Sequence, residues 1–78
     1  MQKELSKKQI ETLISQYTNG EFKDALINVE LLIEEFPNEA LLQNISGACY
    51  ASLGLLDNAE KRYKIALSIN PDYAEASN

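Results

Sequence analysis

The sequence contains no histidine and no tryptophan, and it has only one cysteine, two prolines and three glycines among its 78 residues. Without histidine, the chain has no imidazole for acid–base catalysis and lacks the commonest nitrogen ligand for zinc. Cys49 has no second cysteine for an internal disulfide and no histidine to activate it as a nucleophile. The glycines do not form a phosphate-binding loop. We therefore expect a protein that is not an enzyme, that uses no metal or cofactor, and that buries Cys49 in its core.

Basic residues are also scarce, with 7 lysines and arginines against 12 acidic residues and a formal net charge of −5. The acidic excess lies mainly in residues 1–39, which carry four lysines and eight acidic residues. Few and scattered basic residues argue against a nucleic-acid partner. A partner of the first half is expected to be basic or apolar. The alternative is that the glutamates of residues 1–39 form a solvated helix face and bind no partner.

Long apolar runs are absent as well. No run reaches the roughly 20 residues that cross a bilayer, and the first residues lack the apolar core of a signal peptide. We expect no membrane association and a cytoplasmic location, which the lone cysteine also favours. A chain of this length predicts a single small domain over residues 1–78.

The sequence does contain an internal repeat. When it is shifted by 34 residues, residues 6–39 lie over residues 40–73. The identical pairs are Gln9 and Gln43, Gly20 and Gly54, Ala25 and Ala59, and Pro37 and Pro71. Each glycine is placed to close a helix in the left-handed conformation, and each proline is placed to end one. The residues after the prolines, Asn38 and Asp72, are predicted to cap the next helix, and the alanines suit a close helix contact.

Between these glycines and prolines, apolar residues recur with helical spacing. No segment shows the alternation of apolar and polar residues that is typical of a strand. The pattern predicts four helices, at 7–19, 22–35, 39–53 and 56–69. Ser6 and Gln9 form a capping-box pattern at the start of the first helix. The turns between the helices are so short that neighbouring helices must be antiparallel. The predicted fold class is all-α.

A 34-residue helix–turn–helix unit with these positions resembles the tetratricopeptide repeat (TPR). The residues that carry the resemblance best are Gly47-Ala48-Cys49-Tyr50, Leu53-Gly54, Ala59, Tyr63, Ala66-Leu67 and Asn70-Pro71. The first repeat departs from it at Leu13, Gln16 and Leu32. The resemblance implies two antiparallel helix-turn-helix units stacked as a short right-handed superhelix, an α-solenoid. Repeat 1 is expected at 6–39, repeat 2 at 40–73, and the start of a third repeat or a tail at 74–78.

The resemblance also implies a function, because most TPR domains bind proteins or peptides in a groove lined by the first helix of each pair. Carried over by position, the groove residues are Lys7, Ile10, Ile14, Tyr17, Thr18, Leu41, Asn44, Ala48, Ala51 and Ser52. The alternative is that the larger apolar residues among them belong partly to the core. The lysine and asparagine clamp by which some TPR domains hold a carboxyl terminus is missing, because its matching positions are Ile10, Ile14, Ile45 and Glu75.

A second function class remains open: the chain is a structural N-terminal scaffold fragment of a longer bacterial-type TPR protein. A transferase domain after the scaffold is one form of this alternative. In this sequence, five residues follow Tyr73, and we expect them to be too few to cover the helix at 56–69. Its strip of Ile65, Ile69 and the stem of Arg62 is therefore predicted to mediate self-association.

Overall fold

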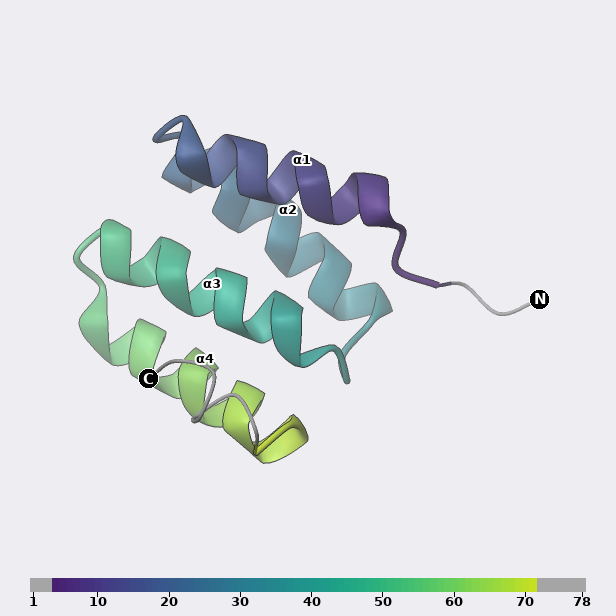
Figure 1. Ribbon diagram of the computed structural model, residues 1–78. Coiled ribbons are helices and arrows are strands. Elements are labelled where there is room, and N and C mark those ends of the chain that lie inside the picture. The colour runs from purple at the N-terminus through teal and green to yellow at the C-terminus, as the bar shows by residue number, and fades with distance from the viewer. Residues whose placement is uncertain (1–3, 72–78) are drawn as a thin grey trace.

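The computed structural model describes residues 4–71, and these residues form four helices and no strand. The helices are α1 (Lys7–Thr18), α2 (Phe22–Glu35), α3 (Ala40–Ser52) and α4 (Leu56–Ile69). Successive helices run antiparallel and follow one another across the molecule as a small helical stack (Figure 1). The predicted all-α fold is confirmed, and each predicted helix end lies within one residue of the observed one. The predictions for Asp72, Glu75 and residues 74–78 fall outside the described residues.

The turn after the first helix of each pair is built in the same way in both pairs. Gly20 and Gly54 both have φ of +81°, a conformation that glycine adopts at little cost. The amide of Glu21 donates to the carbonyl of Gln16 at 2.9 Å, and the amide of Leu55 donates to that of Tyr50 at 2.8 Å. These bonds satisfy carbonyls that the helix end would leave unpaired. The predicted role of both glycines is confirmed.

Of the helix N-caps predicted from the sequence, the structure confirms one and contradicts another. Ser6 and Gln9 form the predicted capping box, in which the Gln9 amide donates to Ser6 Oγ at 3.1 Å and the Ser6 amide donates to Gln9 Oε1 at 2.9 Å. The predicted cap at Asn38 is wrong, because α3 starts one residue later with Glu39 as N-cap and without a side-chain cap. Asn38 lies with Pro37 in the turn itself, since the chain needs these residues to reverse direction.

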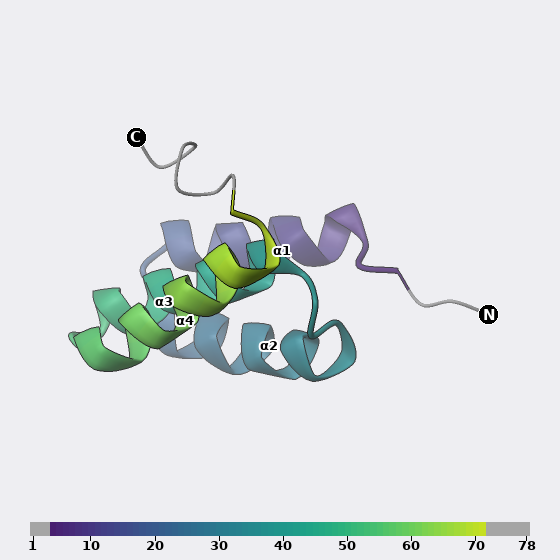
Figure 2. The same cartoon turned by 90° about the horizontal axis from the view of Figure 1, so that it is seen from below.

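The main apolar core lies where α1, α2 and α3 meet. It consists of Leu13, Val29, Leu32 and Leu42, with Leu5, Leu26, Ile33, Phe36 and Ile45 packed around it. Figure 2 shows α1 and α2 on opposite sides of the stack at this end of the molecule. The large side chains of the first pair therefore fill the space that opens between its two helices.

The second pair is built on small residues. Ala59 and Ala66 on α4 are buried, as is Cys49 on α3, and Gly47 lies directly against the ring of Tyr63. Small side chains let helix backbones approach, and α3 and α4 pack more extensively than α1 and α2 do. In the first pair, the equivalent positions 34 residues before Gly47 and Ala66 are Leu13 and Leu32, which depart from the TPR pattern. The departure thus accounts for the difference between the two pairs.

Candidate functional site

The ten residues expected to line a groove all lie on α1 or α3. The structure joins two of them directly, because Ser52 Oγ donates to the Tyr17 hydroxyl at 3.2 Å. This bond links the C-terminal ends of the two helices at the protein surface. Ile14, about one turn before Tyr17, is 50% exposed. The first helices of the two pairs therefore share a surface that carries both apolar and polar groups.

None of the ten residues is fully buried, and they divide into two sets. Lys7, Ile14, Thr18 and Ser52 are exposed, whereas Ile10, Tyr17, Leu41, Asn44, Ala48 and Ala51 are half-buried. Core positions on these helices are taken by other residues, among them Leu13 and Leu42. Ile10 and Leu41 thus contribute both to packing and to the surface. That this surface binds a peptide stays a prediction.

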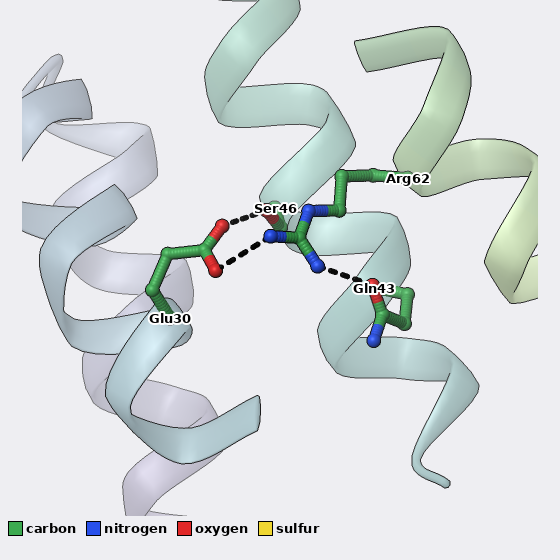
Figure 3. A network of polar contacts seen from close by, with 4 residues as sticks. All are labelled: Glu30, Gln43, Ser46 and Arg62. Atoms are coloured by element: carbon green, nitrogen blue, oxygen red, sulfur yellow. Dashed lines mark hydrogen bonds and ion pairs between the residues drawn. The ribbon is translucent and has the colours of Figure 1, made fainter. Parts of the chain in front are cut away.

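A second feature is a polar network that ties three helices together (Figure 3). Arg62 on α4 donates to Glu30 Oε2 on α2 at 2.8 Å and to Gln43 Oε1 on α3 at 3.1 Å. Ser46 on α3 donates to the other carboxylate oxygen of Glu30 at 2.8 Å. Gln43 and Ser46 are buried polar side chains, so these bonds offset the cost of removing them from water. The network fixes α4 against the first helical pair.

The network changes the interpretation of the predicted self-association strip. The stem of Arg62 lines a surface hollow together with Ile65, but its guanidinium group is bonded to Glu30 and Gln43. Arg62 therefore acts first as a link within the chain and is not free to pair elsewhere. Ile65 is 40% exposed and Ile69 is half-buried. Self-association through these two residues stays a prediction.

The sequence analysis missed a further apolar surface on α2. Ile27 is 62% exposed and Leu31, one turn later, is 59% exposed. They border an open hollow of about 590 Å³ that is also lined by Leu26, Glu30, Ile33, Glu34, Tyr50 and Arg62. The available signal was that α2 is apolar on more than one face, since six of its fourteen residues are leucine, isoleucine or valine.

Burial raises the pKa values of two ionisable groups, and the hydrogen bond and charge of Lys64 lower the pKa of a third, the exposed Glu60. Desolvation, and then the Glu30 charge, raise the pKa of the Cys49 thiol above its usual value. Desolvation also raises the pKa of Tyr63, with smaller effects from Tyr17 and Cys49. A buried, protonated thiol is a poor nucleophile, in agreement with the expectation that Cys49 belongs to the core. Within residues 4–71, no cluster of acidic residues and cysteine could hold a metal ion.

Comparisons with known proteins relate part of this chain to a segment of a longer protein. No protein-family model matches the chain, and no solved structure does. Over 53 residues, 68% of this chain, the sequence is 36% identical to aspartyl/asparaginyl beta-hydroxylase from Homo sapiens. The matched part is 7% of that protein, so the chain resembles one short segment of a much longer relative. The match and the four-helix architecture are compatible with a TPR-like repeat. None of the helices described is long and apolar enough to cross a membrane.

Proposed function

We propose that this chain is a protein-interaction module that binds a peptide segment of a partner protein on the surface shared by α1 and α3. The observation that carries the proposal is the Tyr17–Ser52 hydrogen bond next to the exposed Ile14. It joins the C-terminal ends of the two helices and leaves an apolar anchor point beside small and polar side chains. Such a surface suits an extended or helical peptide with apolar side chains.

The chemistry of the surface suggests how a peptide would be held. Ile14 and the half-buried Ile10 and Leu41 would contact apolar side chains, and the Asn44 amide would hydrogen-bond the peptide backbone. Nothing in this arrangement requires catalysis, and the proposal assigns none to the chain. Its partner is a protein or peptide and not a nucleic acid.

The test is a selection of peptides from a random peptide phage library on the immobilised protein. We expect selected peptides to lose at least about fivefold in affinity when Ile14 is replaced by Asp, because an anchor residue is lost. Asn44→Ala should weaken them as well. The matched control is Leu67→Asp on α4, an exposed apolar residue away from this surface. Peptides that respond equally to Ile14→Asp and Leu67→Asp, or no selected peptides at all, would contradict the proposal.

The match to a hydroxylase segment favours a second candidate function. A similar stretch occurs as 7% of a longer protein, so this chain too can serve as the scaffold part of a larger TPR protein. A transferase domain after the scaffold is the form of this proposal that the sequence suggested. The reading frame that follows Asn78 in the gene distinguishes the candidates. A further helical repeat in frame supports the scaffold, whereas a stop codon supports the independent module.

A further inference from the structure

The hollow beside α2 shares no residue with the proposed peptide surface, because it is lined mainly by α2 with Tyr50 of α3 and Arg62 of α4. Two large apolar residues, Ile27 and Leu31, stand one turn apart and are more than half exposed. They are continuous with Leu26 and Ile33, which pack on the core, and with Tyr50 from α3. Because these two exposed residues are adjacent and lie on the rim of a hollow of about 590 Å³, they form a contiguous apolar patch and not isolated exposed residues.

The charges around the hollow are unequal. Glu30 is paired with Arg62 at 2.8 Å, so these two charges on its wall offset each other. Glu34 also lines the hollow, is exposed, and has no ion pair with any residue from 4 to 71. Glu35 follows it, and the last turn of α2 has no basic residue. The negative end of the helix dipole adds to these carboxylates, so the C-terminal end of the hollow attracts a cation.

The N-terminal part of α2 differs in charge from its C-terminal end. Lys23, one turn before Ile27, is the basic residue of α2, whereas Asp24, Glu30, Glu34 and Glu35 are its acidic residues. The helix thus carries a charge of −3, obtained as one positive minus four negative groups, within a chain of net charge −5. A second copy of the chain would bring another α2 of the same charge against this surface. Charge complementarity instead favours a basic occupant.

We infer that this hollow receives an amphipathic helix of a partner protein, which sets two large apolar side chains against Ile27 and Leu31 and a lysine or arginine beside Glu34. A helix is the fitting shape, because its side chains one turn apart match the spacing of the exposed pair. The N-terminus of the bound helix lies beside the C-terminal end of α2, where the two dipoles attract each other.

The probe for the test is a fluorescein-labelled synthetic peptide of about 18 residues, which is long enough to form a helix. It carries leucine at helical i, i+3, i+4 and i+7 spacing and lysine elsewhere. Binding is measured by fluorescence anisotropy at low salt. Two companion peptides replace every lysine by glutamate or every leucine by alanine. We expect both companions to bind at least about tenfold more weakly than the parent peptide, because each lacks one of the two complementary features.

Protein variants locate the binding. Ile27→Ser and Leu31→Ser should each weaken the parent peptide by about fivefold or more, whereas Leu56→Ser, at a residue 66% exposed outside the hollow, should not. Glu34→Gln should weaken it by about two- to fivefold at low salt, and Glu4→Gln, with the same change in net charge, should have less effect. Circular dichroism establishes that each variant is folded.

Three results would overturn the inference. Unchanged binding by Ile27→Ser and Leu31→Ser would show that the peptide is attracted by net charge alone. A dimer that Ile27→Ser converts to a monomer would show that a second copy occupies the hollow. Loss of binding in Ile14→Asp, with Ile27→Ser unaffected, would place the peptide on the α1–α3 surface. That last result would support the proposed function while contradicting this one, so the two proposals fail separately.

Discussion

Single residues decide how closely each helical pair packs, and the clearest case is Gly47. A Cβ atom built on Gly47 would lie 2.7 Å from Tyr63 Cε1 and 2.8 Å from Cδ1, which is closer than carbon atoms can pack. The equivalent positions in the first pair, 34 residues earlier, are Leu13 and Val29. A small residue facing a large one in the second pair thus replaces two medium-sized residues in the first. The size of each residue is matched to the one it faces.

We predict that Gly47→Ala destabilises the protein by about 1–2 kcal/mol through overpacking against Tyr63. An alanine in a helix interior otherwise gains about 0.5–1 kcal/mol over glycine, so a loss would be evidence of the contact. In a Tyr63→Val background, which copies Val29, the same change should be neutral or stabilising. Urea unfolding of the four proteins measures the coupling. Equal effects of Gly47→Ala in both backgrounds would contradict the account.

The sequence predicted much at this scale, because glycine, proline and capping patterns act locally. It could not predict the role of Arg62. Helical spacing indicated only that the stem of Arg62 lies beside Ile65 on the same helix. Its guanidinium group reaches Glu30, 32 residues earlier in the chain, and this pairing depends on how three helices pack. Ile27 and Leu31 were missed for a related reason. Helical periodicity shows that α2 is apolar on several faces, but only the packed structure shows which of those faces stays uncovered.

At the scale of helices, the Glu30–Arg62 network is the main polar link between the two pairs. Its side chains are 30% and 25% exposed, and both partners make a second hydrogen bond to α3. The pair of Glu60 and Lys64 on the surface of α4 has a similar length, 2.9 Å, but its side chains are 65% and 72% exposed. The two ion pairs therefore have similar lengths but differ in solvent exposure and in the hydrogen bonds around them. Their basic partners, Arg62 and Lys64, both lie on α4, so substitutions of these two residues can be compared directly.

We predict that Arg62→Met lowers the free energy of unfolding by about 1–2 kcal/mol, because it leaves Glu30 and the buried Gln43 without their partner. The methionine keeps much of the apolar stem, so the loss reports the guanidinium group. Lys64→Met should cost less than about 0.5 kcal/mol, as expected of an exposed pair. Chemical unfolding with urea measures both variants. If the two substitutions cost the same, the network does not hold the pairs together.

At the scale of the whole molecule, two forces act against each other. The net charge of −5 makes copies of the chain repel one another, whereas α4 presents apolar surface at Ile65 and Leu67, which are 40% and 39% exposed. Salt screens the repulsion and leaves apolar attraction largely intact. Association between copies should therefore depend on ionic strength in a direction that identifies its cause. An association driven by ion pairs would weaken with added salt, and one driven by apolar contact between acidic chains would strengthen.

We predict that the protein self-associates through Ile65 and Ile69 at tens of micromolar, and that its average mass rises with added salt. The paired substitutions Ile65→Lys and Ile69→Lys should give a monomer, since they place two cations on the strip where apolar contact is expected. Because Ile69 is half-buried, Ile65→Ser alone serves as the milder variant. Ile27→Ser on α2 is the matched control and should leave the mass unchanged. Sedimentation velocity measures all four proteins. A parent protein that is monomeric at every salt concentration, or a double variant that associates as strongly as the parent, would rule out this contact.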